Sequence, residues 1–337
     1  MIFDELREAL IKENKDFDEF IGQERVKNQL KSALISGHHV ILIGPPGIGK
    51  TTLGKNIAKL LKEKEVMDCG FNCDPKDPWC PFCKSGKITK KKILKPEDRF
   101  IRIQGSPDLT YEDLIGDIDP SKAIRYGAFS IEAFKPGKIF RANNGILFFD
   151  ELNRCPPKLQ NALLQILEEK KATIGSYEFD LKSDFILIAT MNPEDENTEP
   201  LSDVFLDRVD VIYVNYPESL EIEKKIIDKK AKQICNVDEK IKEIMIEFVR
   251  YLRTNEKLEK KPSVRASISL YERAQANALI NKRDYVILED VLESLISVLS
   301  HRIRLKPSVE YTTNVKDFIK NEFDFFIKNK KEKGDFP

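Results

Sequence analysis

The sequence lacks a net charge, since 56 Lys and Arg residues balance 56 Asp and Glu residues in a chain of 337. A strongly basic chain would attract nucleic acid with its whole surface, and the balance removes that argument while leaving room for a local basic patch. Charged residues make up 33% of the chain and both signs are interspersed. This pattern is typical of the surface of a soluble protein.

Long apolar runs are also missing, because no stretch approaches the roughly 18 apolar residues that a membrane-spanning helix needs. Residues 1–17, MIFDELREALIKENKDF, are acidic and amphipathic, whereas a secretory signal starts with basic residues and continues into an apolar core. We therefore expect no export signal, no membrane partner and a cytoplasmic chain. In a reducing cytoplasm, clustered cysteines favour a metal ion over disulfide bonds.

Strand and helix patterns alternate up to residue 217. The apolar, β-rich segments that predict strands are residues 40–43, 99–105, 145–151, 184–193 and 209–217. Helical spacing predicts helices within residues 17–36, 51–64 and 156–171, the last with an apolar face of Leu159, Leu163, Ile166 and Leu167. This alternation predicts an α/β domain with a parallel sheet over residues 1–216. Only helical periodicity follows, so we predict a smaller all-helical domain over residues 217–337.

A phosphate-binding loop follows the first predicted strand. The motif G-x-x-x-x-G-K-[ST] is matched in full by Gly44, Pro45, Pro46, Gly47, Ile48, Gly49, Lys50 and Thr51. Its glycines allow backbone N–H groups to surround phosphate oxygens at the start of a helix. We expect Lys50 to reach the β- and γ-phosphates of ATP, Thr51 to bind Mg²⁺ and Thr52 to complete the nucleotide-binding set. A chance glycine-rich turn is the alternative, which the flanking strand and helix disfavour.

Two further strand ends carry polar residues. The third predicted strand, ILFFDE, ends in Asp150 and Glu151. We expect Asp150 to lie beside Mg²⁺ and Glu151 to polarise the attacking water, although adjacent acids can also be plain solvated surface. Asn192 ends the fourth strand in ATMNP, where it would either orient the attacking water or form an Asn-Pro turn.

The order and spacing of these motifs resemble those of AAA+ ATPases, specifically the branch of MoxR-like ATPases and the magnesium-chelatase ATPase subunit. The resemblance is carried by FIGQE (20–24), FKPGKIFRANNGILFFDELNRCPPKLQNALLQILEE (134–169), LSDVFLDRVD (201–210) and PSVRASISLYERAQANALINKRDYVILEDV (262–291). It implies a P-loop AAA+ domain with a helical lid, Mg²⁺-dependent ATP hydrolysis and self-association into a ring, expected as a hexamer. It also implies a protein partner, for which a von Willebrand A domain is one candidate, or a metal-insertion complex.

Four residues receive their expected roles from this resemblance. Ile21 and Gly22 would lie on the adenine side of the nucleotide, Arg208 would be an arginine finger acting on a neighbouring subunit's nucleotide, and Arg265 would be the second sensor. A guanidinium is a permanently charged fork that offsets charge on the transferred phosphoryl group. An ion pair of Arg208 with a nearby aspartate, and a solvated Arg265, are the alternatives. Val209 stands where the family commonly has phenylalanine.

Residues 121–140 match the position of an extra hairpin-and-helix insert in this branch. The apolar residues of the segment are Ile124, Tyr126, Phe129, Ile131 and Phe134. They favour either an element that faces a partner or a small separate core beneath the loop. Arg141 and Arg154 lie near the third strand, where they would cross subunit interfaces or form surface ion pairs.

Residues 65–98 interrupt the α/β pattern, and we interpret them as an insertion. Its cysteines, Cys69, Cys73, Cys80 and Cys83, are spaced C-x3-C-x6-C-x2-C. Four thiolates suit a closed structural zinc site, and a metal would supply folding free energy to an insertion with few apolar residues. A [4Fe–4S] cluster and free thiols are the alternatives. Cys155 and Cys235 are isolated in the sequence.

The sequence therefore predicts an ATP-driven motor that remodels or activates a partner protein or a metal-insertion complex. A DNA-dependent motor is a second hypothesis, because residues 84–95, KSGKITKKKILK, are locally basic. This stretch lacks interleaved aromatic residues, which favours a solvated lysine run instead of a nucleic-acid site. A nucleotide-dependent switch with negligible turnover is a third hypothesis.

Overall fold

The computed structural model describes residues 2–127, 130–169, 184–193 and 200–332. The chain separates into two compact units. The first comprises Met1–Phe20, Glu24–Gly44 and Gly49–Val214, and the second comprises Ile21–Gln23, Pro45–Ile48 and Asn215–Pro337. None of the described helices is long and apolar enough to cross a membrane.

Among the described residues of the first unit, five strands form a sheet in the order β4-β7-β8-β1-β9. They are β1 (Val40–Ile43), β4 (Phe100–Gln104), β7 (Gly145–Asp150), β8 (Phe185–Met191) and β9 (Asp210–Tyr213). Each lies within a segment that predicted a strand, so the predicted α/β fold is confirmed. All neighbouring strands run parallel, which places their carboxyl ends at one edge of the sheet.

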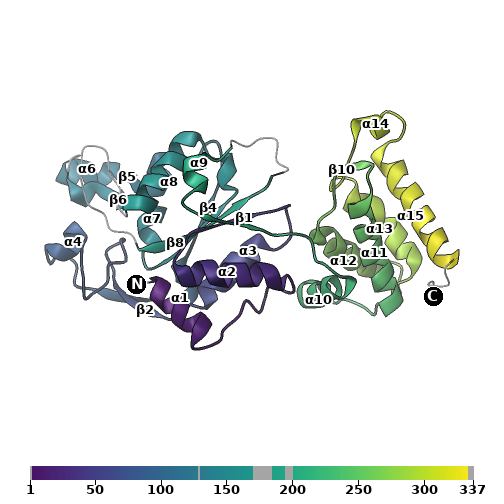
Figure 1. Ribbon diagram of the computed structural model, residues 1–337, viewed down its shortest axis with the longest axis horizontal. Coiled ribbons are helices and arrows are strands. Elements are labelled where there is room, and N and C mark those ends of the chain that lie inside the picture. The colour runs from purple at the N-terminus through teal and green to yellow at the C-terminus, as the bar shows by residue number, and fades with distance from the viewer. Residues whose placement is uncertain (1, 128–129, 170–183, 194–199, 333–337) are drawn as a thin grey trace. The chain divides into compact units, whose positions relative to one another are not determined.

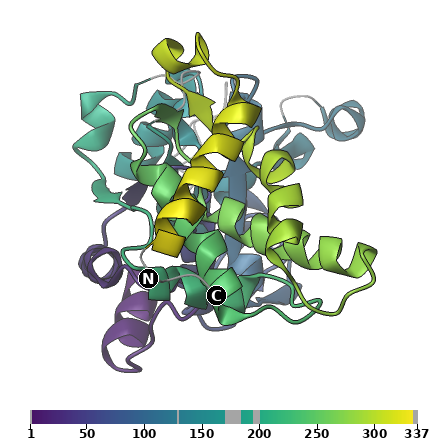
Figure 2. The same cartoon turned by 90° about the vertical axis from the view of Figure 1, so that its right-hand side faces the viewer.

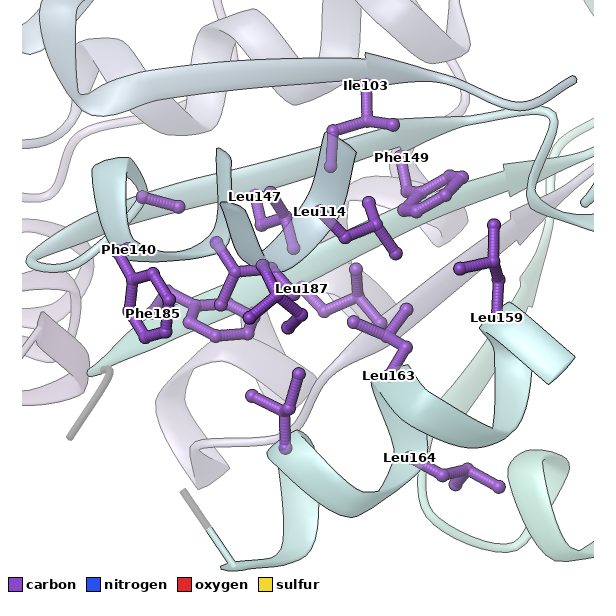
Figure 3. Close-up of a cluster of buried hydrophobic side chains, with 14 of the residues drawn as sticks. Ile103, Leu114, Phe140, Leu147, Phe149, Leu159, Leu163, Leu164, Phe185 and Leu187 are labelled. Carbon is purple, nitrogen blue, oxygen red and sulfur yellow. The ribbon is translucent and has the colours of Figure 1, made fainter. Parts of the chain in front are cut away.

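Helices cover both faces of this sheet (Figure 1). On one face lie α2 (Glu24–Ser36) and α3 (Lys50–Lys59), and on the other lie α8 (Pro157–Glu169) and α9 (Asp203–Leu206). Because both faces are covered, the central strands are nearly continuous apolar runs and do not alternate, with polar residues only near the carboxyl ends of β7 and β8. Figure 3 shows one face, where the sheet residues Leu147 and Leu187 lie near Leu159 and Leu163 of α8.

The predicted apolar face of α8 is the face that packs on the sheet. Leu159, Leu163 and Ile166 are buried in the core of the first unit, and Leu167 packs against the same core from a partly buried position. The helix begins at Pro157, where a proline costs no backbone hydrogen bond.

Two small ribbons accompany the main sheet. The sequence did not predict the ribbon in the insertion, whereas the resemblance implied a hairpin-and-helix insert at residues 121–140, which the second ribbon overlaps. The insertion is framed by antiparallel β2 (Lys64–Met67) and β3 (Lys91–Leu94) and also holds α4 (Pro81–Lys84) and the 3-10 turn η1 (Pro96–Arg99). A hairpin of β5 (Gly116–Ile118) and β6 (Phe134–Pro136) carries α6 (Pro120–Tyr126) and η2 (Ile131–Ala133) between its strands. The first unit also contains α1 (Ile2–Ile11), α5 (Tyr111–Ile115), α7 (Lys138–Arg141) and η3 (Leu152–Arg154).

The insertion belongs to the core of the first unit. Its cysteines, Phe71 and Trp79 lie in the same cluster of buried residues as Leu147 and Phe149 of β7. The expectation that a bound metal supplies folding free energy to the insertion stays a prediction, and the surrounding domain adds apolar contacts of its own. The few apolar side chains of the insertion are buried against the surrounding domain, which supplies the rest of their core.

Within its described residues, the second unit is helical apart from one short ribbon. Its helices are α10 (Leu220–Lys230), α11 (Glu239–Thr254), α12 (Val264–Ile280), α13 (Leu288–Leu299), α14 (Pro307–Glu310) and α15 (Val315–Glu332). The ribbon of β10 (Leu258–Lys260) and β11 (Arg304–Leu305) is too short to leave a periodic signal in the sequence. Helix α15 crosses the face of this unit in Figure 2, and the rings of Phe323 and Phe248 meet edge to face with centroids 4.8 Å apart.

Candidate functional site

The predicted phosphate loop connects β1 to α3. Gly47 and Gly49 have positive φ angles of 76° and 100°, and Gly49 directly precedes the first residue of the helix. The Lys50 ammonium donates to the carbonyl of Gly44, at the other end of the loop. The loop is therefore curled, with the lysine folded back over it, at the start of a helix that favours anions.

Asp150 ends β7 at the same edge of the sheet. Its Oδ1 accepts a hydrogen bond of 2.7 Å from the Thr190 hydroxyl, and its Oδ2 accepts one from the Arg102 guanidinium. The Thr190 oxygen also accepts from the backbone N–H of Glu151 at 2.9 Å. A single buried hydroxyl of β8 therefore holds the backbone and the carboxylate at the end of β7.

Glu151 takes a left-handed backbone conformation, with φ 56° and ψ 51°. Its Oε2 accepts from the Gln104 amide at 2.9 Å and lies 3.1 Å from the Arg154 guanidinium. Gly105 donates its N–H to the carbonyl of Asp150 at 2.7 Å, and a Cβ at Gly105 would lie 2.0 Å from the Glu151 carbonyl oxygen. Only glycine permits this approach, which brings the end of β4 against the acidic pair.

The sequence did not identify Arg102, Gln104, Gly105 and Thr190 as site residues. Thr190 had a detectable signal, since it is a fully buried polar residue in the apolar run FILIATM. Gln104 had none, because its place opposite Asp150 depends on the register of β4 against β7.

Asn192 directly follows β8, which lies between β7 and β1 in the sheet. The backbone carbonyl of Asn192 accepts from the Asn153 amide at 3.3 Å. The strand order therefore puts Asn192 at the edge that carries Asp150 and the phosphate loop. Its predicted role toward the attacking water stays a prediction.

Arg208 follows α9 and forms an ion pair with Glu168 of α8. The alternative considered from the sequence was an aspartate partner, whereas Asp210 instead lies 3.0 Å from His38. Arg208 also donates to the carbonyl of Val204 at 2.6 Å. Exposed ion pairs of this kind contribute little to stability, about 0–1 kcal/mol, so they hold a side chain only weakly.

Arg265 is exposed in the first turn of α12, in the second unit. The charge of Arg265 also acts on Arg302. Burial, together with this like charge, lowers the pKa of the Arg302 guanidinium. Arg302 donates to Ser269, one turn beyond Arg265, at 3.1 Å. Gly22 also belongs to the second unit and has a φ of 73°.

The four clustered cysteines lie far along the sheet from Asp150. Their Sγ atoms all lie within 4.8 Å of one another, and all four residues are buried. The side-chain amide of Asn143, which precedes β7, donates to the carbonyls of Phe71 and Asn72 at 3.0 and 3.2 Å. The insertion is therefore attached where β7 begins, and the strand of about six residues spans roughly 20 Å before Asp150. The cysteines take no part in the acidic site.

The remaining cysteines differ from the cluster. Cys155 is buried, and burial raises the pKa of its thiol to about 11. Cys235 is partly exposed, and burial also raises the pKa of this thiol. Both are therefore predominantly protonated at neutral pH and poor nucleophiles.

Three known families match successive parts of the chain. Residues 16–69 match the magnesium chelatase subunit ChlI family, residues 86–211 match the ATPase family associated with various cellular activities, and residues 250–321 match the AAA lid domain. A mutant RuvB from Thermotoga maritima shares the fold, with a TM-score of 0.51, 20% identity, and coverage of 85% of this chain and 72% of that one.

Curated relatives extend over most of the chain. The magnesium-chelatase subunit ChlI homolog of Methanocaldococcus jannaschii is 32% identical over 329 residues, covering 86% of each chain. The chaperone MoxR1 of Mycobacterium tuberculosis is 30% identical over 317 residues, covering 85% of this chain and 72% of the relative. Since this identity extends across the ATPase segment and its lid alike, the chain belongs to the MoxR and magnesium-chelatase branch of AAA+ ATPases and is an ATP hydrolase.

Proposed function

We propose that this chain is the subunit of an oligomeric ring that uses ATP binding and hydrolysis to remodel or activate a partner protein or a metal-insertion complex. The observation that carries this proposal is the convergence of the phosphate loop, Asp150, Glu151 and Asn192 at one edge of the parallel sheet. The relatives named a chaperone and a magnesium-chelatase subunit support work on a partner protein or within a metal-insertion complex. The cytoplasm is the compartment we propose for this activity.

The residues at this edge fit a nucleotide with Mg²⁺. The Thr51 hydroxyl in the first turn of α3 and the half-buried Asp150 carboxylate supply the oxygen donors that Mg²⁺ takes. The Arg102 guanidinium pairs with Asp150, so it has to release or share this carboxylate when Mg²⁺ binds. When bound, Mg²⁺ would neutralise charge on the β- and γ-phosphates.

The end of β7 with Asp150 and Glu151, here called the acidic corner, and the phosphate loop would carry out different parts of the remaining chemistry. In our proposal Lys50 leaves the Gly44 carbonyl for the phosphates, while Ile21, Gly22 and residues 44–52 surround the rest of the nucleotide. Glu151 accepts a hydrogen bond from the attacking water. Before the nucleotide binds, Gln104 and Arg154 hold the Glu151 carboxylate in place. Asn192 orients that water from the end of β8.

Assembly would complete each site. Arg208 is held in its own chain by an ion pair with Glu168 and one carbonyl, and such a weakly held guanidinium can turn toward a neighbouring subunit's nucleotide. We propose this arginine-finger role for Arg208, the second-sensor role for Arg265, and a hexamer as the ring.

The hairpin between β5 and β6 offers a surface for the partner. Ile124 and Tyr126 on α6 are 90% and 48% exposed, whereas Phe134 on β6 is buried in the core of the first unit. Both interpretations of the segment therefore apply to different parts of it. The base of the hairpin, at β6, belongs to the core, and its tip, at α6, is exposed. Phe129 and the Ile131 side chain lie outside the described residues. We propose that the tip contacts a protein partner, for which a von Willebrand A domain is one candidate.

The cysteine cluster fits a structural zinc ion. Four thiolates form a closed donor set with no open position for a substrate water, and the cluster is remote from the acidic corner. We propose that Cys69, Cys73, Cys80 and Cys83 bind one Zn²⁺.

The DNA-dependent motor is not favoured. Lys91 is paired with Glu65 at 2.8 Å, and Lys90 and Lys92 each lie 3.6 Å from Asp68. The basic run is therefore largely balanced by carboxylates of the same insertion, which weakens its attraction for phosphate.

The test is a pull-down with the full-length Glu151→Gln variant held in its ATP state. We expect loss of hydrolysis by a factor of about 10²–10⁴ with ATP binding retained, and recovery of a specific protein partner. Glu112→Gln, which changes an exposed carboxylate on α5, should hydrolyse ATP normally. Recovery of nucleic acid alone, with salt-sensitive stimulation of the ATPase by DNA, would overturn the proposal.

A further inference from the structure

The turn from Cys69 to Cys73 carries a buried phenylalanine between its two cysteines. The Phe71 ring lies 5.5 Å from the Trp79 ring and 6.1 Å from the Phe82 ring, both in the insertion. It also lies 6.2 Å from Phe134 and 5.4 Å from Phe140, as measured between centroids. The ring therefore joins the insertion to β6 and α7, and aromatic pairs at these distances attract beyond the area they bury.

Two further contacts tie the insertion to the same hairpin. A Cβ at Gly70, whose φ is 79°, would lie only 2.9 Å from Pro136 at the end of β6, so this approach requires glycine. Lys87, beyond the last cysteine, forms an ion pair with Glu132 of η2. The hairpin thus contacts both the turn from Cys69 to Cys73 and the segment that follows Cys83.

A polar network anchors the turn to the sheet. The Asn144 amide donates to the Asn72 carbonyl at 2.9 Å, and the Asn72 amide donates to the Arg141 carbonyl at 2.8 Å. Asn143 adds its two bonds to the carbonyls of Phe71 and Asn72. Every one of these bonds requires the turn in one conformation, which includes a left-handed Asn72 with φ 48°. A non-glycine residue adopts that conformation at a cost.

We propose that a Zn²⁺ ion bound by the four cysteines fixes the turn from Cys69 to Cys73 in the conformation that supports the β5–β6 hairpin. Metal occupancy then decides whether helix α6, the partner-facing tip of this hairpin, is held in place. The inference rests on the proposed zinc site and on the proposed role of the tip. Coordination by Cys69 and Cys73 ties both ends of the turn that contains Phe71 to one ion. The turn is then already restricted in conformation when the Phe71 ring packs against the hairpin.

The sulfur separations favour a single ion. Around one Zn²⁺ with Zn–S bonds of about 2.3 Å, tetrahedral thiolates stand about 3.8 Å apart. The observed limit of 4.8 Å between all Sγ atoms is close to that value. A [4Fe–4S] cluster binds each thiolate to a different iron and holds the sulfurs further apart. The backbone N–H of Cys83 also donates to Cys80 Sγ at 3.4 Å, which stabilises a thiolate there.

The first experiment measures metal content and hairpin protection in the full-length chain. We expect about one zinc per chain in the wild type, none in Cys80→Ser, and an unchanged content in the matched control Cys235→Ser. Hydrogen exchange at residues 116–118, 134 and 135 should be at least about tenfold faster in Cys80→Ser than in Cys235→Ser. If Cys80→Ser does not fold, the same exchange is measured on wild type before and after zinc is removed by a chelator, and after Zn²⁺ is added back.

A second variant separates the effect of the Phe71 contact with the hairpin from the effect of metal binding. Phe71→Ala keeps all four thiolates, so it should retain zinc and the basal ATPase rate while exchange of the hairpin still accelerates. Binding of Co²⁺ to metal-free protein should give the visible spectrum of a tetrahedral thiolate site. Absence of bound metal, an iron–sulfur chromophore, or metal loss without faster hairpin exchange would each overturn the inference. Loss of the motor function alone would leave these results unchanged, so the two proposals fail separately.

Discussion

The Thr190 hydroxyl on β8 donates to Asp150 Oδ1 at 2.7 Å and accepts from the N–H of Glu151 at 2.9 Å. One side chain therefore satisfies both the acid proposed to bind Mg²⁺ and the backbone of the acid proposed to activate water. Because Thr190 is fully buried, water cannot replace either bond without rearrangement.

We predict that Thr190→Val impairs hydrolysis without unfolding the chain. The valine has the same shape but leaves a buried acceptor and donor unpaired, at a cost of about 1–3 kcal/mol. If misplacement of Asp150 and Glu151 raises the activation free energy of hydrolysis by the same amount, kcat falls roughly tenfold or more. Steady-state ATPase assays check this, with Thr254→Val, an exposed threonine of α11, as the control. An unchanged kcat would show that the hydroxyl does not position the acids.

The proposed arginine finger predicts complementation between two inactive variants. Arg208→Ala should lose most of its ATPase rate, since an arginine finger contributes about 10³–10⁵-fold. When it is mixed with Glu151→Gln, rings gain sites that combine an intact Glu151 with an intact Arg208 from the neighbour, and activity should partly return. Mixtures that remain as inactive as each variant alone would argue against a finger supplied by another subunit.

Glu168→Ala is the matched control for that experiment. It removes the partner that holds Arg208 within its own chain but leaves the guanidinium itself. We expect an ATPase rate close to wild type, because an exposed ion pair contributes about 0–1 kcal/mol.

The lid contains a buried ion pair whose loss should destabilise it strongly. Glu223 is fully buried and accepts from Arg253 through two bonds of 2.7 Å and from Ser267 at 2.6 Å. Glu223→Ala leaves the arginine charge buried and unpaired, which costs about 3–5 kcal/mol. Denaturant unfolding should show this loss, while Glu259→Ala, whose exposed carboxylate lies 4.0 Å from Arg304, should change stability by less than about 1 kcal/mol.

Asp290 should make the lid sensitive to acid. Burial acts to raise the pKa of this carboxyl, but the Arg283 guanidinium, with two bonds of 2.7 Å, and the N–H of Ile287 hold the pKa below its ordinary value of 3.8. The stabilisation is complete above the unfolded-state pKa and is lost as the pH falls through the lower folded-state value.

We therefore predict that Asp290→Asn lowers stability at pH 7 and flattens its fall below about pH 4. Unfolding midpoints measured at a series of pH values check this, with the exposed Asp324→Asn on α15 as the control. A parallel loss of stability in Asp290→Asn and wild type at all acidic pH values would contradict the role of this carboxyl.

The main sheet could be predicted because its signals are local. A buried parallel strand must be apolar over several consecutive residues, and the runs before Gly44, at ILFFD and at FILIATM meet that condition. The phosphate loop was also predictable, since its glycines and Lys50 are contiguous. The ribbon of β10 and β11 in the second unit was missed, because strands this short carry no period.

The sequence by itself determined the chain's family, the strands of its main sheet, and the acids and loop that we propose bind and hydrolyse ATP. Tertiary structure alone decided that Gln104 and Thr190 hold those acids, because each reaches the end of β7 only through the register of a neighbouring strand. It also decided where the cysteine turn lies. Phe71 and its neighbours look too few to bury a core when counted along the insertion, but aromatic rings of β6 and α7, distant in sequence, complete that core around them.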